Sequence, residues 1–361
     1  MRIRERTGDV SKGFCGRDKG NMDGEYHSEM EEFIENGVFV YGPRKAGTTL
    51  VQNLLDGSNS IMMVPDELKL KFMVPKILES SREKKAFYFK EGRSSFRNNL
   101  EITENGGKYN IGIKGPFRYG NMSKKDLDGK FDLERYVKGL NRIANDPEIR
   151  RLKDIYSHDI LEFRESLREG GKYRYWASKE VGGDPELIVT HFKSIFPELK
   201  CIFIARDPKI VVRSIILKRR SRGVILSMKR IFTECHKAQR IISYYATVKG
   251  CSNKILVFYE DLTRDTNQEM KRIARFLQIP YEGIFEIPSL FGISVKVRTS
   301  SRNTRSVFPE KKNWKKALKF REKCAVMISS FSYALFRRMV GTQLVTYQKL
   351  RKMTGHSSGN G

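Results

Sequence analysis

Short hydrophobic runs alternate with longer amphipathic stretches between about residues 37 and 280. The runs have the lengths and the Gly, Pro or charged boundaries of buried strands, and they lie at 38–41, 61–64, 173–177, 200–205 and 254–259. The amphipathic stretches repeat their apolar residues with helical spacing and predict helices at 185–196, 208–219, 226–247 and 265–277. Strands that alternate with helices form parallel sheets. The pattern therefore predicts an α/β protein with three layers, α/β/α, around a central parallel sheet.

The pattern is interrupted at both ends of the chain and once in the middle. Residues 1–35 mix charges with few aliphatic side chains, which predicts a flexible tail, and the Gly/Ser-rich residues 354–361 predict a disordered one. A single domain is expected over residues 36–353. Within it, the charged and aromatic residues 79–169 predict an insertion beside the functional site, and a basic amphipathic helix is expected from about residue 321 to 352.

The turn after the first strand carries a phosphate-binding pattern, Gly42-Pro43-Arg44-Lys45-Ala46-Gly47-Thr48-Thr49. A helix that begins directly after a glycine turn directs its unpaired N–H groups to one point, where they can hold a phosphate. The pattern differs from the nucleotide-binding GxxxxGK[ST], because Lys45 precedes the second glycine and Thr48 takes the place of the kinase or ATPase lysine. The loop therefore predicts a phosphate site and disfavours a nucleoside-triphosphate enzyme.

Two further segments at strand ends supply independent signals. Arg206-Asp207-Pro208 follows the run at 200–205, and proline suits the first turn of the next helix. Ser214 lies eight residues after Arg206, two turns into that helix. The run at 254–259 ends in Tyr259-Glu260-Asp261-Leu262.

Together these three segments resemble the motifs of sulfotransferases, which use 3′-phosphoadenosine 5′-phosphosulfate (PAPS) as sulfuryl donor. The resemblance covers roughly residues 37–280 and implies a P-loop NTPase-like fold, with the loop around the 5′-phosphosulfate and with Arg206 and Ser214 on the 3′-phosphate. Tyr259 is expected at the nucleotide, and the segment around Ser300 and Arg302 has the composition to close over the 3′-phosphate. The residues expected to bind the donor are Arg44, Lys45, Ala46, Gly47, Thr48, Thr49, Arg206, Ser214, Tyr259, Ser300 and Arg302.

Sulfuryl transfer needs charge relief on the leaving phosphate and a base for the acceptor. Lys45, inside the loop, is placed to stabilise the charge on the leaving oxygen. Glu67 leaves the second predicted strand 22 residues after Lys45, and its similarity to the glutamate of glycan sulfotransferases implies a general base; a surface glutamate at the start of a helix stays open as the alternative. Lys179, 27 residues before Arg206, resembles a second family lysine that holds the sulfuryl oxygens, with Lys114 as its rival.

The net charge of +27, from 69 basic and 42 acidic residues, indicates anionic partners such as nucleic acid, acidic glycans or lipid head groups. Because no RNA-binding signature accompanies the charge, no specific nucleic-acid partner is expected. In the C-terminal helix, the apolar residues Phe331, Tyr333, Leu335 and Phe336 precede Arg337-Arg338. Packing of this stripe against the sheet is favoured, and contact with an anionic membrane surface stays open.

The five cysteines have no metal-binding spacing, which predicts reduced thiols and no metal site. Neither a secretory signal nor an apolar run of transmembrane length is found in the sequence, so a cytoplasmic location is expected.

The leading hypothesis is a PAPS-dependent sulfotransferase that modifies a hydroxyl or an amine of a saccharide or glycolipid and releases adenosine 3′,5′-bisphosphate. The insertion at 79–169 would then cap the acceptor. A sulfotransferase for small alcohols or phenols is the nearest alternative. A nucleotide kinase is disfavoured by Thr48, and a non-catalytic polyanion-binding protein would not account for the three ordered motifs.

Overall fold

The computed structural model describes most of the chain between residues 23 and 339. The described residues are 23–67, 85, 88–89, 100–114, 118–119, 122–247, 253–295, 297–298, 303–304, 315, 318–331, 333–335 and 337–339. The predicted tails at residues 1–22 and 354–361 lie outside this set.

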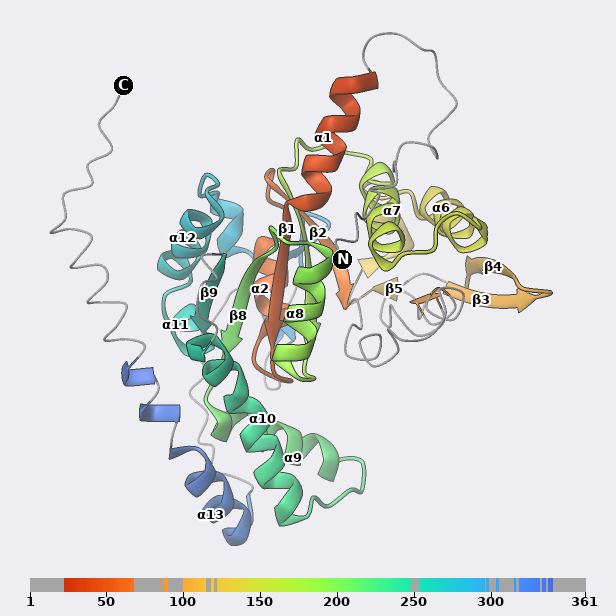
Figure 1. Cartoon of the computed structure of the whole chain (residues 1–361). Coiled ribbons are helices and arrows are strands. Elements are labelled where there is room, and N and C mark those ends of the chain that lie inside the picture. Colours follow the sequence, from red (N-terminus) through yellow and green to blue (C-terminus); the bar gives the residue numbers. More distant parts are fainter. Residues whose placement is uncertain are drawn as a thin grey trace, which may run out of the picture.

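Five parallel strands form the centre of the molecule (Figure 1). They are β1 (Gly37–Gly42), β2 (Ile61–Glu67), β7 (Tyr175–Val181), β8 (Lys200–Ala205) and β9 (Lys254–Phe258). Their order is β2-β7-β1-β8-β9, so β1 is the middle strand and pairs with β7 and β8. Every residue of β1 is buried, because helices cover the sheet on both faces and the strand is apolar on both.

Helices form the two outer layers. One face of the sheet packs against α2 (Thr48–Leu55), α11 (Tyr259–Arg264), α12 (Thr266–Leu277) and the short 3-10 helix η5 (Gly283–Glu286). The other face packs against α1 (Asp23–Glu35), α7 (Leu152–Glu165), α8 (Pro185–Ile195) and α10 (Met228–Thr247). Val38 and Val40 of β1 point to the first set of helices, and Phe39 and Tyr41 point to the second. The predicted three-layer α/β/α fold is confirmed.

Helix α1 corrects the prediction of a flexible tail up to residue 35. Its residues Phe33 and Ile34 are buried, and the carbonyl of Ile34 accepts a hydrogen bond of 2.7 Å from the indole N–H of Trp176. Met30 packs beside them on the same side of the helix. An apolar stripe of three residues in an otherwise polar segment is too short to stand out in the sequence, yet it suffices to attach the helix to β7.

The described part of the predicted insertion contains two hairpins and three helices. The elements are β3 (Leu100–Asn105), β4 (Lys108–Ile113), β5 (Arg118–Tyr119), β6 (Met122–Ser123), α5 (Lys124–Asp128), α6 (Leu133–Asn145) and α7. Asn141 and Asn145 of α6 bind the backbone of β4 with their side-chain amides, at 2.7–2.9 Å from the N–H and C=O groups of Ile111 and Tyr109. These hydrogen bonds hold the hairpin of β3 and β4 on α6. A role in covering the acceptor stays a prediction.

The helix after the phosphate loop is also anchored at its far end. The buried carboxylate of Asp56 accepts hydrogen bonds from Ser289 Oγ at 2.9 Å and from the backbone N–H of Gly292 at 2.8 Å. Ser289 and Gly292 belong to the hairpin of β10 (Ser289–Leu290) and β11 (Ile293–Ser294). Burial raises the pKa of Asp56 to about 6. A second small hairpin, of β12 (Val297–Arg298) and β13 (Asn303–Thr304), follows.

The C-terminal helix packs at the lower end of the molecule in Figure 1, beside α9 (Pro208–Arg220) and α10. It comprises α13 (Phe320–Ser329), and residues 331, 333–335 and 337–339 are also helical. Its buried Ala325 and Val326 join a small cluster with α9 and α10. Of the stripe predicted to pack against the sheet, Phe331 and Leu335 are exposed, so the prediction is wrong for these two residues, and Phe336 lies outside the described residues. Tyr333 does reach β9, with its ring centroid 6.3 Å from that of Phe258. In the described part of the chain, no helix has both the length and the apolar character needed to cross a membrane.

Candidate functional site

The turn between β1 and α2 has an unusual backbone conformation. Lys45 has φ 68° and Gly47 has φ 108°, both in the left-handed region. The carbonyl of Pro43 accepts a hydrogen bond of 3.1 Å from the N–H of Ala46, which closes the turn. A Cβ atom on residue 47 would lie 2.2 Å from Cδ2 of Tyr259. Glycine is therefore required at position 47 by its backbone angle and by the neighbouring ring.

Helix α2 begins directly after this turn and presents its N-terminus there. Its first hydrogen bonds run from the N–H groups of Leu50 and Val51 to the carbonyl of Gly47. The N–H groups of Gly47, Thr48 and Thr49 lie at the start of the helix, where no carbonyl of the same helix can accept a hydrogen bond from them. Such N–H groups, together with the positive end of the helix dipole, form a site for a phosphate or sulfate group.

Arg206 connects the loop with the two other segments that the sequence singled out. It follows β8, the strand next to β1, and its guanidinium donates a hydrogen bond of 2.7 Å to the carbonyl of Lys45. The same guanidinium lies over the ring of Tyr259, 4.0 Å from the ring centroid. Arg206 is only 8% exposed, and burial lowers its pKa. The structure therefore brings Lys45, Arg206 and Tyr259 together at one end of the sheet.

A second connection fixes the start of α9. The carboxylate of Asp207 caps the helix by accepting a hydrogen bond of 2.9 Å from the N–H of Lys209. The N–H of Asp207 donates a hydrogen bond of 2.8 Å to Glu260 on α11. Ser214 lies two turns further along α9 and is half-buried. The segments around Arg206 and Tyr259 are thus held to each other before any ligand binds.

The side chain of Lys45 is exposed at this junction, close to other cations. Partial burial of its amine and, to a smaller extent, the positive charges of Lys218 and Arg206 lower the pKa of Lys45. A bound anion would remove this repulsion. The charges at the loop therefore favour a ligand with several negative charges.

Glu67 and Lys179 lie beside each other on β2 and β7. The two residues are register partners, and Lys179 Nζ is 3.4 Å from Glu67 Oε1. Lys179 is buried and Glu67 is half-buried. Both lie near the carboxyl ends of their strands, which is also the end of β1 from which the phosphate loop emerges. Lys114, the rival of Lys179, instead follows β4 in the hairpin and is exposed.

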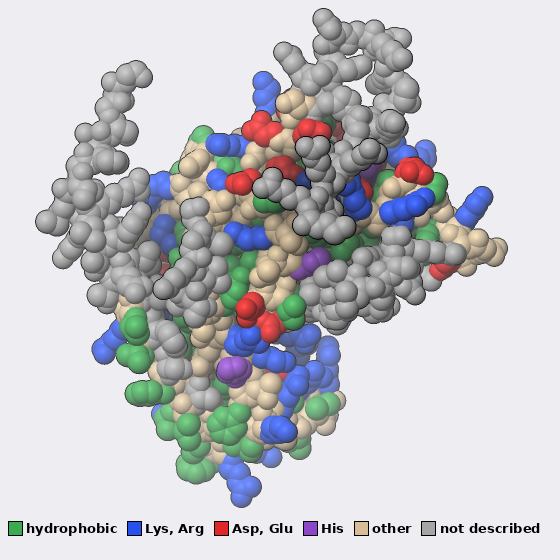
Figure 2. Space-filling view, in the orientation of Figure 1, with side chains coloured by type: hydrophobic (Ala, Val, Ile, Leu, Met, Phe, Trp, Pro, Cys, Tyr) green, Lys and Arg blue, Asp and Glu red, His purple; other side chains and the backbone are tan. Residues whose placement is uncertain are grey.

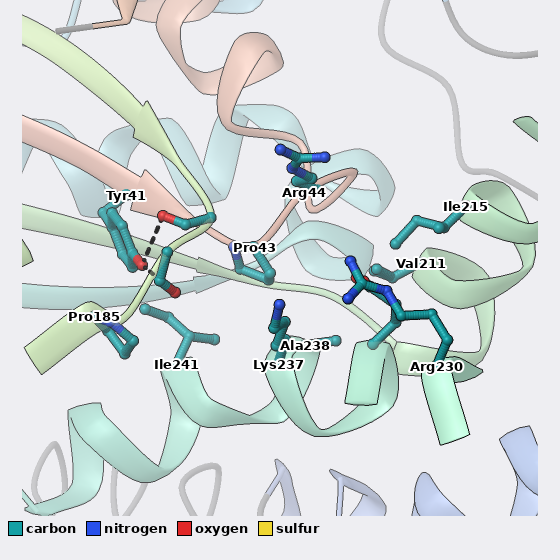
Figure 3. Close-up of a pocket in the computed structure, with 13 residues that line it drawn as sticks. Tyr41, Pro43, Arg44, Pro185, Val211, Ile215, Arg230, Lys237, Ala238 and Ile241 are labelled. Carbon is teal, nitrogen blue, oxygen red and sulfur yellow. Dashed lines mark hydrogen bonds and ion pairs between the residues drawn. The ribbon is translucent and has the colours of Figure 1, made fainter. Parts of the chain in front are cut away.

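A pocket of about 140 Å³ opens next to the loop (Figure 3). Tyr41 closes one end of it, and its hydroxyl lies 3.2 and 3.3 Å from the carbonyl oxygens of Gly182 and Gly183. Lys237 extends from α10 toward Pro43. The lining residues are Tyr41, Pro43, Arg44, Gly182, Gly183, Pro185, Val211, Ile215, Arg230, Glu234, Lys237, Ala238 and Ile241.

A second hollow of about 120 Å³ continues this pocket, because Arg44, Ile215, Arg230 and Glu234 line both. Its other lining residues are Lys45, Lys218, Arg219, Arg222 and Leu226. We call the two hollows together the basic groove. It runs from Gly182 along α9 and α10 to Arg222, and the side chain of Glu234 in it is paired with Arg230 at 2.9 Å.

The sequence did not single out the contributions of α10 to this groove. Arg230 and Lys237 are seven residues apart, which places them on the same side of the helix. That spacing was the available signal, but it gives no indication that this side of α10 faces the phosphate loop. Ser300 and Arg302 lie outside the described residues. Within the described part of the chain, no group of three or more His, Cys, Asp and Glu side chains is arranged to hold a metal ion.

Comparisons with known proteins agree with this geometry. The model of the sulfotransferase family matches residues 37–283. Protein-tyrosine sulfotransferase A of Caenorhabditis elegans is 27% identical over 120 residues, which cover 32% of this chain and 32% of that protein. The match thus spans about a third of the length of this curated relative. The solved structure of the sulfotransferase domain of the Synechococcus PCC 7002 olefin synthase has a similar fold, with a TM-score of 0.52 and 16% identity over 82% of this chain and 94% of that one.

Proposed function

This chain belongs to the sulfotransferase family, and from that premise we propose that it transfers the sulfuryl group of PAPS to an acceptor hydroxyl. The observation that carries the proposal is the contact between Arg206 and the carbonyl of Lys45, which joins two strand ends into one cationic site. The donor has anionic groups at two separate positions, the 5′-phosphosulfate and the 3′-phosphate. A helix N-terminus and a buried guanidinium next to it match that distribution of charge.

In the proposed donor complex, the N–H groups of Gly47, Thr48 and Thr49 and the hydroxyls of Thr48 and Thr49 bind the 5′-phosphosulfate, while the N–H of Ala46 keeps its hydrogen bond to the carbonyl of Pro43. Arg206 and Ser214 bind the 3′-phosphate from β8 and α9. The ring of Tyr259 supports Gly47 and Arg206 at the edge of the nucleotide, consistent with its contacts to both. Arg44 reaches the donor from the outer side of the loop, where it also lines the basic groove.

In the proposed reaction, Glu67 removes the proton of the acceptor hydroxyl while the oxygen attacks sulfur. The bond between sulfur and the bridging phosphate oxygen breaks, and adenosine 3′,5′-bisphosphate leaves. Lys45 stabilises the charge that develops on the bridging oxygen, and Lys179 binds the sulfuryl oxygens. The contact of 3.4 Å between Lys179 and Glu67 supports this division of roles, because it places a cation and a base side by side.

Calorimetric titration with adenosine 3′,5′-bisphosphate tests the donor site. We expect binding by the wild-type chain and weaker binding by Arg206→Ala, about thirtyfold, because a charge-assisted hydrogen bond to phosphate is worth about 2 kcal/mol. Arg264→Ala is the matched control, since that side chain is 70% exposed and pairs only with a surface aspartate among the contacts described. Unchanged affinity in Arg206→Ala, or tighter binding of ATP with Mg²⁺ than of the bisphosphate, would contradict the proposal.

We propose a saccharide, free or on a glycolipid, as the acceptor. The basic groove supports this choice, because Arg44, Lys218, Arg219, Arg222 and Lys237 offer cations to an acidic sugar next to the sulfuryl group. A peptide tyrosine is the second candidate, favoured by the similarity to protein-tyrosine sulfotransferase A. Sulfate transfer to a panel of acidic oligosaccharides, neutral oligosaccharides, phenols and tyrosine peptides distinguishes these acceptors. Transfer to the peptides in preference to all sugars would overturn the saccharide assignment.

A reducing compartment, the cytoplasm, is proposed for the protein. The sequence supports the proposal, because its five cysteines are widely spread with no CxxC pair, and disulfide frameworks are rare in reducing compartments.

A further inference from the structure

The C-terminal helix is apolar on the side that faces away from the protein. Phe320 is 79% exposed, Ile328 67% and Phe331 80%, and Met327 is exposed beside them. Relative to Phe320, these residues follow at positions i+7, i+8 and i+11, which fall on one side of a helix of 3.6 residues per turn. The exposed Leu335 and Met339 continue the same side in the helical residues that follow.

The opposite side of this helix is already used for packing. Ala325 and Val326 are buried in the small cluster with Val212, Ile216 and Ile231. A helix on the surface of a globular protein normally presents polar residues outward, so a second apolar side requires a partner. The outward stripe therefore has the composition of an interaction surface, whereas the outer side of an ordinary surface helix is polar.

The turn between α9 and α10 adds further exposed apolar residues at this end of the molecule. Ile225 is 74% exposed, and Val224, Met228 and Phe232 are exposed with it. α13 packs directly on α10, which brings these residues and the stripe to the same end of the molecule. Figure 2 shows hydrophobic side chains gathered at this lower end, with Lys and Arg side chains beside them. We call the stripe and the turn together the terminal apolar surface.

Exposed basic residues lie along the same helices and turn as the terminal apolar surface, Arg321 and Arg338 on the side of the stripe itself, and acidic residues are almost lacking in these segments. Arg219, Arg222, Lys229, Arg321 and Arg338 are exposed. From residue 208 to 247 the sequence has a single acidic residue, Glu234, and from residue 318 to 339 a single one, Glu322. Both are paired, with Arg230 and Arg220 respectively. The exposed basic residues, which we call the basic rim, therefore give this end of the molecule a positive charge.

We propose that the terminal apolar surface docks on an anionic lipid bilayer, with Ile225, Ile328 and Phe331 inserted among the acyl chains and the basic rim on the head groups. Large apolar side chains rimmed by Lys and Arg are the composition that binds the interface of anionic membranes. A second copy of the chain fits less well, because two basic rims would face each other across such an interface. Docking would also place the basic groove at the lipid surface, since Arg222 and Leu226 of its lining flank Val224 and Ile225.

Cosedimentation of the full chain with vesicles tests this proposal and does not depend on the proposed sulfuryl transfer. We expect binding to equimolar phosphatidylcholine and phosphatidylserine vesicles, and much weaker binding to phosphatidylcholine alone. The double variant Ile328→Ser/Phe331→Ser should bind at least about tenfold more weakly, because it removes two inserted side chains. Leu187→Ser is the matched control, as Leu187 is 57% exposed on α8 and should leave vesicle binding unchanged.

A second variant, Arg321→Gln/Arg338→Gln, tests the rim separately and should weaken binding to the anionic vesicles while leaving the thermal unfolding midpoint in place. Three results would overturn the proposal: equal binding to both kinds of vesicle, unchanged binding by Ile328→Ser/Phe331→Ser, or a dimer of the wild-type chain in light scattering that this double variant converts to a monomer without any vesicle binding.

Discussion

The two sides of the phosphate loop are built differently. Toward β8 and β9, the loop is held by a buried guanidinium, an aromatic ring and a glycine that admits no side chain, at Arg206, Tyr259 and Gly47. Toward β2 and β7, the described contacts are lighter: an ion pair of 3.4 Å between Lys179 and Glu67, and hydrogen bonds from the hydroxyl of Tyr41 to the carbonyls of Gly182 and Gly183, where the basic groove begins. The first side is closely packed around the loop by a ring and a guanidinium, whereas the second places a cation and a carboxylate side by side with less packing around them.

This difference suggests that recognition of the donor is a property of the fold, while recognition of the acceptor depends on a few replaceable side chains. A substitution on the side of β8 and β9 should then change stability together with donor binding. A substitution on the side of β2 and β7 should change turnover and leave stability and donor binding as they are.

Glu67→Gln gives the largest expected effect and tests the side of β2 and β7. We expect turnover to fall about a thousandfold, because loss of a general base removes that order of rate acceleration. Affinity for adenosine 3′,5′-bisphosphate and the unfolding midpoint should stay constant, since glutamine keeps the shape of the side chain. Rates of sulfate transfer and calorimetric titration provide the two measurements.

Glu269→Gln is the control for this substitution, because Glu269 is also half-buried and ion-paired, with Arg272 on α12. Should Glu67→Gln retain wild-type turnover, Glu67 is not the base and the proposed mechanism loses its proton acceptor.

Gly47→Ala tests the side of β8 and β9. We expect a loss of about 3 kcal/mol in the free energy of unfolding, because alanine would combine a left-handed backbone with a clash against the ring of Tyr259. Donor binding should weaken in parallel. Urea denaturation followed by circular dichroism measures the first effect.

Gly129→Ala serves as the comparison, since a Cβ on residue 129 meets no atom within 4 Å. If Gly47→Ala were as stable as Gly129→Ala, the loop would be less constrained than its contacts indicate, and the contrast between the two sides would weaken.

Asp56→Asn gives the smallest expected effect and tests how far the closely packed side extends along α2. Burial raises the pKa of Asp56 to about 6 in the folded state, above its value in the unfolded chain. The protonated carboxyl therefore stabilises the folded state fully at pH values below the unfolded pKa. This stabilisation is lost as pH rises through about 6. Relative to Asp56→Asn, the wild-type chain should therefore lose about 1 kcal/mol of stability between about pH 5 and pH 7.

Urea denaturation of both chains at a series of pH values measures this difference. An identical pH dependence of the two chains would mean that Asp56 titrates in the folded protein as it does in the unfolded one.

The sequence predicted the parallel sheet and the loop because these depend on local patterns. An apolar run followed by Gly42, and proline after Asp207, define strand ends without knowledge of the remaining chain. Helix α1 was missed because its apolar stripe is short and gains its stability from Trp176, more than 140 residues away in sequence. Tertiary packing of this kind overrides local composition.

Within the candidate site, the sequence identified residue types but not their contacts. Arg206 donates to the backbone carbonyl of Lys45, and that carbonyl is oriented by the left-handed backbone conformation of Lys45. A pattern of side chains does not predict this backbone conformation. The groove side of α10 likewise depends on how the helix is rotated against β8. In the C-terminal helix, hydrophobicity alone did not separate the buried Tyr333 from the exposed Phe331.

The bond between Arg206 and Lys45 has one more consequence, for protein engineering. The atom that accepts this hydrogen bond is the backbone carbonyl oxygen of residue 45. An amino acid that tolerates a positive φ, such as asparagine, could therefore replace Lys45 without loss of the bond to Arg206. The side chain at position 45 could thus be replaced by one with a different functional group while the backbone of the loop keeps its conformation.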